Sequence, residues 1–273
     1  GVTSDAQGNT VAGTNAGDSF SGTDANNNTL IGKNAGTAIT TADDCVAVGE
    51  DALAGTTTGS NNIGIGVDAL KANTTGTGNI GIGRRCLDAN TEGNLNVAIG
   101  QSALGANTTA DNNTAVGYGA LNVNTTGTRN VAVGANALDA ATTANNNTAI
   151  GYDALTENTT GAQNTTVGNK SLDANTTGES NTAVGHIALG SNTTASNNTA
   201  IGDSALWANT TGSDNVAVGS GALDANTTGT YLVAVGKGAL TNATTASNNV
   251  AIGRVAMEAA TTAYNNVAVG TRA

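Results

Sequence analysis

The chain has 273 residues, a formal net charge of −11, 11% charged residues and 2% aromatic residues. The acidic charge and the scarcity of aromatic side chains argue against nucleic acid or an anionic membrane as a partner. No apolar run approaches the roughly 20 residues that span a bilayer, so membrane insertion is not expected. Proline is absent, which is typical of a chain whose backbone N–H groups nearly all donate hydrogen bonds.

A glycine that follows Val or Ile returns every 17 residues, from Gly32 to Gly270, with no insertion between copies. Such a period indicates one small unit stacked on itself. We number this glycine as position 0 of each coil. The pattern predicts one cooperative domain, with a wider first coil in residues 1–31 and a regular array in residues 32–273.

Each coil is expected to hold two short strands. Leu recurs at position 4, Ala at position 6 and Thr at position 8, so these side chains are expected to face inward from the first strand. The second strand has Val, Ile or Thr at position 14 and Val or Ile at position 16, as in Val131 and Val133, and we expect these inward too. The sequence therefore predicts an all-β fold, a parallel two-sheet β-solenoid (β-roll) of about fifteen 17-residue coils.

Asparagine recurs at position 13 and in nine copies at position 7, while threonine fills position 8. Stacked identical side chains can donate and accept hydrogen bonds along the axis, which predicts ladders. The alternative at position 7 is N-glycosylation, because many of these asparagines begin Asn-Thr-Thr sequons. The ladder residues are Asn62, Asn79, Asn96, Asn113, Asn130, Thr108, Thr125 and Thr142; the sequons begin at Asn73, Asn107, Asn124, Asn158, Asn175, Asn192, Asn209 and Asn226.

Position 15 is Ala, Gly or once Thr166, and it is never charged. Lying between two inward neighbours, its side chain is expected to point outward, where a closely packed partner would explain the exclusion of charge. We interpret this column as an assembly interface, with local packing that forbids bulk as the alternative. The interface residues are Ala47, Ala98, Ala115, Ala132, Ala149, Ala183, Ala200, Ala217, Ala234, Ala251 and Ala268.

Both ends of the array are expected to present unpaired backbone groups to another chain, because neither carries a capping helix or proline. The end-to-end contacts predicted from this are Val11 and Phe20 at one end and Val269 and Ala273 at the other. Head-to-tail stacking of copies would satisfy these groups.

Few residues of the chain could serve in catalysis or bind a metal ion. The single histidine, His186, occupies a variable turn position with no partners for a metal cluster or a catalytic triad, so neither enzyme activity nor a cofactor is expected. Glu50, Asp51 and Asp68 lie on successive turns and form a weak candidate for a calcium site.

The two cysteines, Cys45 and Cys86, are expected to be free thiols. They lie more than two coils apart, on the order of 10 Å along the stack. A disulfide tolerates only about 7 Å between Cα atoms.

The segments Asn96–Gly100, Asn130–Gly134 and Asn249–Gly253 read Asn-Val-Ala-Ile-Gly or Asn-Val-Ala-Val-Gly. They resemble the head repeats of trimeric autotransporter adhesins. Residues 113–121 are similar to repeats of phage tail-fibre and bacterial surface proteins. This resemblance implies a left-handed parallel β-roll, often trimeric, that projects from a surface and serves in attachment.

The sequence thus predicts a non-enzymatic, secreted structural protein, a fibre or filament subunit that assembles with itself head-to-tail or as a trimer. Attachment to a cell-surface receptor or glycan is a further expectation. One alternative is an ice-binding protein with a flat Thr or Asn face, although only position 9, such as Thr126 and Thr160, is expected outward. A phage tail-fibre shaft and a polysaccharide-cleaving β-helix enzyme are the others.

Overall fold

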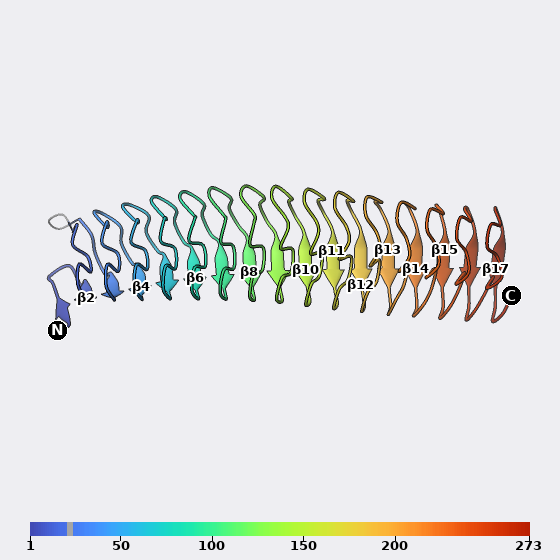
Figure 1. The fold of residues 1–273 in the computed structure, drawn as a ribbon, viewed down its shortest axis with the longest axis horizontal. Helices are drawn as coiled ribbons and strands as arrows, with labels where there is room; N and C mark the ends of the chain where they lie inside the picture. Colours follow the sequence, from blue (N-terminus) through green and yellow to red (C-terminus); the bar gives the residue numbers. More distant parts are fainter. Residues whose placement is uncertain (21–23) are drawn as a thin grey trace. The chain divides into compact units, whose positions relative to one another are not determined.

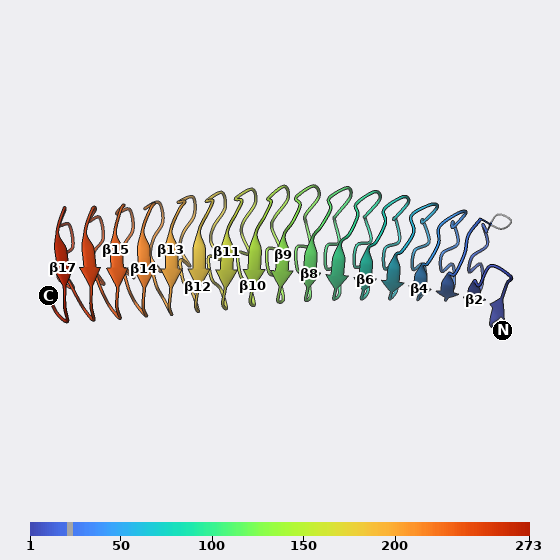
Figure 2. The same cartoon turned by 180° about the vertical axis from the view of Figure 1, so that it is seen from behind.

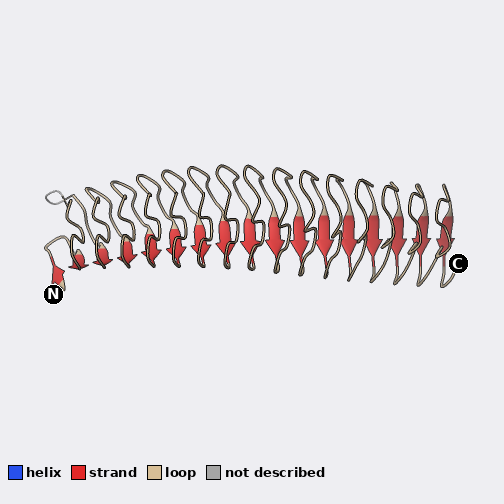
Figure 3. Ribbon diagram, viewed as in Figure 1, coloured by secondary structure: helices blue, strands red, loops and turns tan. Residues whose placement is uncertain are grey.

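The computed structural model describes residues 1–20 and 24–273 and confirms an all-β β-solenoid with about 15 turns of about 17 residues. The chain forms two compact units, Gly1–Ala135 and Asn136–Ala273. Each regular coil contributes one three-residue strand, and the described residues between strands form turns and bends with no helix among them (Figure 3).

In the first unit, each strand from β2 to β8 pairs in parallel with the strand of the next coil (Figure 1). The register places Ala47 beside Gly64 and Ala98 beside Ala115, one coil apart. The strands are β1 (Thr3–Ser4), β2 (Thr10–Ala12), β3 (Thr29–Ile31), β4 (Val46–Val48), β5 (Ile63–Ile65), β6 (Ile80–Ile82), β7 (Val97–Ile99), β8 (Thr114–Val116) and β9 (Val131–Val133).

The second unit repeats this arrangement from β10 to β17, again in parallel (Figure 2). Ala183 lies beside Ala200, and Ala234 beside Ala251. The strands are β10 (Thr148–Ile150), β11 (Thr165–Val167), β12 (Thr182–Val184), β13 (Thr199–Ile201), β14 (Val216–Val218), β15 (Val233–Val235), β16 (Val250–Ile252) and β17 (Val267–Val269).

The first of the two expected strands does not form. Positions 1 to 6 are turns and positions 8 and 9 form a bend, so the described coils of each unit build one sheet and not two. The position 4 leucines have left-handed backbone angles, for example a φ of 50° at Leu104 and 54° at Leu138. A left-handed residue with a side chain costs roughly 1–2 kcal/mol, and full burial of a leucine side chain offsets a cost of that size.

The inward positions are 3, 4, 7, 10, 13 and 15, so the prediction was correct for the position 4 leucines and wrong for positions 6, 8, 14 and 16. At position 8, Thr108 is half-buried. The turns are hydrogen-bonded from coil to coil as the strands are: the N–H of Leu104 donates to the carbonyl of Ala120 at 3.0 Å, and that of Ala106 to Asn122 at 2.8 Å. A proline at such positions would remove a donor from the stack.

The sequence predicted an open edge at the N-terminal end, and this was wrong for β2. The strand β1 pairs antiparallel with β2 and places Thr3 opposite Val11. Phe20 is half-buried, and its ring lies 3.0 Å from the point where Gly17 would carry a Cβ. The wider first coil also runs through residues 21–23, which lie outside the described residues.

At the other end, Val269 is 69% exposed, and the Ala273 carbonyl accepts a 2.9 Å hydrogen bond from the N–H of Met257. Contact of these two residues with another chain stays a prediction.

The glycine of position 0 is required by the close approach of successive coils. Gly219 has a φ of 132°, and a Cβ there would lie 2.7 Å from the carbonyl carbon and oxygen of Gly236. Both the backbone angle and the space therefore exclude a side chain. Gly221, in the same turn, has a φ of 64°, but a Cβ there would meet only Asp224 Oδ2, at an ordinary contact distance of 3.8 Å.

We expect Gly219→Ala to lower the stability of the second unit by more than about 2 kcal/mol, because backbone strain and overlap with the next coil add. Gly221→Asn is the control, since Asn136 occupies the corresponding position of another coil with a φ of 54°. Thermal unfolding followed by circular dichroism compares them. Equal melting temperatures for the two variants would contradict this account of the glycine column.

Candidate functional site

The alanine column of position 15 lies inside the coil and not on its surface. Ala132 and Ala149 have no exposed surface, and the same holds for the other predicted interface alanines except Ala268, which is half-buried in the last strand. The expected outward orientation was wrong, and the alternative of local packing is the correct one. A Cβ on Gly64 would lie 3.1 Å from the Cγ of Leu53, so the position 4 leucine leaves room only for a small residue.

Because strand neighbours point to opposite faces, the residues of positions 14 and 16 point outward. They form what we call the aliphatic face of each unit, the outer side of β3–β9 and of β10–β17. Every residue there is Val, Ile or Thr. Ile65 is 37% exposed, Ile150 39% and Ile201 41%, and every other residue of this face is half-buried or exposed.

The position 13 asparagines confirm the first predicted ladder. The N–H of Asn79 donates to Oδ1 of Asn62 at 2.9 Å, and Nδ2 of Asn62 donates to the Gly76 carbonyl at 2.7 Å. Asn96, Asn113 and Asn130 each make the same backbone bond to the preceding asparagine. These side chains are fully buried, so the column satisfies backbone groups that water cannot reach.

The position 7 asparagines form a second column, in which the hydrogen bonds from coil to coil join one side chain to the next. Asn90 Nδ2 donates to Oδ1 of Asn73 at 2.8 Å, and Asn107 Nδ2 to Oδ1 of Asn90 at 2.7 Å. All the sequon asparagines are fully buried. A glycan on their amide nitrogens is incompatible with the folded coil, so the ladder is correct and the glycosylation alternative is not.

The threonines of position 8 also bond along the stack, but from a half-exposed edge. Thr108 Oγ1 donates to the Thr125 carbonyl at 3.3 Å, and Thr142 Oγ1 to the Thr159 carbonyl at 3.4 Å. Their ladder is therefore side chain to backbone, which spacing alone did not reveal.

A further column at position 11 was missed in the sequence. Side-chain oxygens there accept the backbone N–H of the preceding coil: Asp111 Oδ1 from Asn94 at 2.6 Å, and Ser196 Oγ from Glu179 at 3.0 Å. The recurrence of Asp, Asn, Ser and Thr at this position was the available signal, because these residues have short side chains that bond to backbone groups nearby.

The carboxylates considered for calcium are paired with basic side chains. Glu50 lies 2.9 Å from the Lys33 ammonium, and Lys71 lies 2.8 Å from Asp51 and 2.9 Å from Asp68. The hydrogen bond from Lys71 lowers the pKa of Asp51, and the hydrogen bonds to Asp51 and Asp68 raise the pKa of Lys71. Residues 1–20 and 24–273 contain no group of three or more His, Cys, Asp or Glu that could hold a metal ion.

Both cysteines are free and buried, which confirms the expectation of two thiols. Burial raises the pKa of Cys86 to about 12 and also raises that of Cys45, so both are protonated and unreactive at neutral pH. His186 is exposed, as expected, and its Nδ1 lies 3.0 Å from Asp203 Oδ2.

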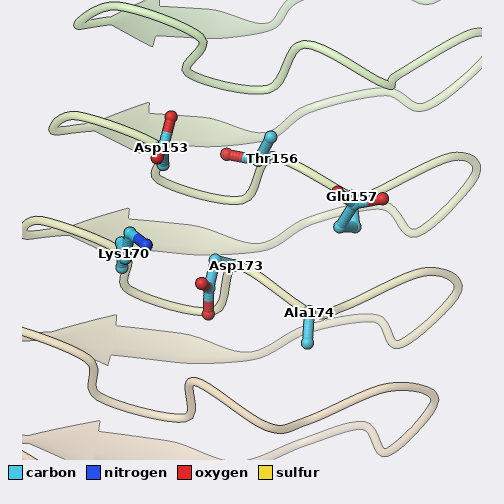
Figure 4. A pocket seen from close by; sticks show the side chains of 6 residues that line it. All are labelled: Asp153, Thr156, Glu157, Lys170, Asp173 and Ala174. Atoms are coloured by element: carbon cyan, nitrogen blue, oxygen red, sulfur yellow. The ribbon is translucent and has the colours of Figure 1, made fainter.

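The second unit has a surface cavity of about 270 Å³ between the turns of two successive coils (Figure 4). Asp153, Thr156 and Glu157 come from one coil, and Lys170, Asp173 and Ala174 from the next. Burial, together with the charge of Asp153, raises the pKa of Asp173 above its ordinary value, and Lys170 opposes this shift. The cavity therefore offers hydrogen-bond acceptors and donors with an excess of negative charge.

No protein-family model matches the sequence, and no curated protein matches it significantly. Among the described residues there is no helix able to span a membrane.

We expect Asn198→Ala to destabilise the second unit by about 1–3 kcal/mol, because it leaves a buried N–H without an acceptor. Oδ1 of Asn198 accepts the N–H of Asn215 at 3.1 Å, and its Nδ2 donates to the Gly212 carbonyl at 2.9 Å. Asn242→Ala makes the same chemical change at an exposed position and should have little effect. Chemical denaturation measures both, and comparable losses would refute the role of the ladder.

Asp139→Asn should stabilise the protein at pH 7. Burial and the charges of Glu157 and Asp153 raise the pKa of Asp139, so its charged form is disfavoured in the folded state. The penalty applies above the folded pKa and disappears as pH falls below the unfolded value of about 3.9. Melting temperatures at pH 7 and at about pH 3 should therefore differ between variant and parent only at pH 7.

The matched control is Asp51→Asn, because hydrogen bonds from Lys71 and Asn34 lower the pKa of Asp51. A lowered pKa stabilises the folded state above the unfolded value and is lost as pH falls through the folded value. This variant should therefore be less stable than the parent at pH 7. A shift of the same sign in both variants would contradict the assignment.

Proposed function

We propose that the chain is a non-enzymatic, extracellular structural subunit that associates with copies of itself through the aliphatic face. The observation that carries this proposal is an array of Val, Ile and Thr side chains in each unit that is uncharged and has no buried member. Soluble monomers rarely expose an apolar patch larger than a few hundred Å².

The size of the face supports association. Seven strands in the first unit and eight in the second, about 4.8 Å apart and each three residues of about 3.3 Å long, give each unit a face on the order of 400 Å². A face of that size equals about half of the roughly 800 Å² that each partner buries in a standard protein interface.

The occupant that fits this face best is another copy of the chain. A copy carries the same 17-residue period, so its side chains can meet those of its partner at every coil. It also brings no charge, and burying an unpaired charge would cost several kcal/mol. Closed association of identical faces is common among soluble oligomers.

The resemblance of residues 96–100 and 249–253 to adhesin head repeats supports the same role, with a trimer as the form it implies. Head-to-tail contact through Val269 and Ala273 would extend such an assembly into a filament. Attachment to a cell-surface receptor or glycan, and use as a phage tail-fibre shaft, belong to the same proposal.

Ice binding is a second candidate that one observation favours. Thr148, Thr165, Thr182 and Thr199 occupy position 14 of four successive coils on the aliphatic face, a Thr column that was expected to point inward. β-branched side chains on a parallel sheet are stiff and regularly spaced. Thermal hysteresis of the purified protein tests this function, and its absence at millimolar concentration removes it.

Val218→Glu combined with Val235→Glu should convert the assembly to the 26.3 kDa monomer, because four or more carboxylates would meet across the interface. Light scattering after size exclusion measures the mass, and circular dichroism checks the fold. Thr211→Glu with Thr228→Glu is the control, since position 9 is exposed and carries Glu92 in another coil. A monomeric parent protein, or a double valine variant of unchanged mass, would overturn the proposal.

A further inference from the structure

Trp207 is the only tryptophan of the chain and is 48% exposed. It occupies position 5, a turn position filled in other coils by small or polar residues such as Thr156, Asp173 and Thr241. An indole at such a place adds no core packing. It presents an apolar face and one N–H donor to solvent, which is the usual chemistry of a recognition residue.

Gly190 brings the tryptophan close to a carboxylate. It holds position 5 in the coil between Asp173 and Trp207, and because it has no side chain the indole ring can lie against it. The point where a Cβ would stand lies 3.2 Å from Cδ1 of Trp207 and 3.5 Å from Oδ1 of Asp173. The indole and the carboxylate thus lie close to the same glycine.

Asp173 also lines the cavity described above, together with Asp153, Thr156, Glu157 and Lys170 (Figure 4). What we call the strip therefore runs along the turns of the second unit from this hollow, past the Asp173 carboxylate and Gly190, to the indole of Trp207. The hollow of about 270 Å³ is near the lower limit of small-molecule pockets. Its size suits one ring of a ligand whose next ring lies toward Trp207.

We propose that this strip is a saccharide-binding site. A sugar ring has an apolar C–H face that packs on an indole, and hydroxyl groups that donate to carboxylates and accept from ammonium and hydroxyl groups. The hollow supplies both kinds of partner through Asp153, Asp173, Lys170 and Thr156. The excess of carboxylates selects neutral or amino-bearing saccharides and repels acidic ones.

This inference is independent of self-association, because the strip lies on the turns and the aliphatic face lies on the strands. It deepens the proposed attachment to a glycan, on which its biological role rests, by naming the residues that bind and the class of saccharide. The Val218→Glu and Val235→Glu double variant should therefore keep its saccharide affinity whether or not it changes mass.

The lone tryptophan makes the test direct. Titration of the full chain with neutral cello-oligosaccharides and with amino-bearing chitosan oligosaccharides should change the Trp207 fluorescence in a saturable way, while acidic oligogalacturonate should not. Calorimetry then compares variants: Asp173→Asn should weaken binding at least tenfold, and Trp207→Thr, which installs a residue found at position 5 in other coils, should abolish it.

Asp88→Asn is the matched control, because Asp88 is also a half-buried position 5 aspartate with a pKa raised by burial, but it lies in the first unit. It should bind like the parent. No saccharide response in the parent, equal binding of the acidic oligosaccharide, or unchanged affinity in both site variants would each overturn the proposal. A loss of affinity in Asp88→Asn equal to that of Asp173→Asn would do so as well.

Discussion

Hydrogen bonds between equivalent segments of successive coils are the constraint on which the rest of the structure depends. They join strands, such as β4 to β5, and they also join turns, where Leu53 donates to the Ala69 carbonyl at 3.0 Å. Each residue must therefore keep its place over its counterpart in the next coil. This requirement explains the unbroken period, the absence of proline and the glycine whose neighbour lies too close for a side chain.

A coil of 17 residues encloses a narrow interior, and that interior decides which side chains face outward. Leucine of position 4, small residues of positions 3 and 15, and two asparagines fill it. The larger Val and Ile residues of the strand have no room inside and lie on the outer face. The apolar surface available for association is thus a consequence of close packing within the coil.

The period, the β-solenoid class, the inward leucines, the asparagine columns and the free thiols could all be predicted from the sequence. The orientation of the strand could not, because a three-residue strand such as Val131–Val133 fits either direction equally well. Size, and not hydrophobicity, decides it, as the contact between Leu53 and Gly64 shows. The left-handed leucines and the approach of Trp207 to Asp173 depend on backbone angles and on a missing side chain, which no periodic pattern expresses.

The position 7 amides all donate in the same direction. Asn90 donates to Asn73 and Asn107 to Asn90, and in the second unit Asn192 donates to Asn175 and Asn209 to Asn192. Aligned amide dipoles in a buried row polarise one another. Each row is therefore electrically polar, and in the first unit it finishes at Asn124 Oδ1, which has no hydrogen-bond partner among the described residues. The side-chain hydrogen bonds of each stack of coils thus run in one direction along it, as the parallel strands of the backbone do.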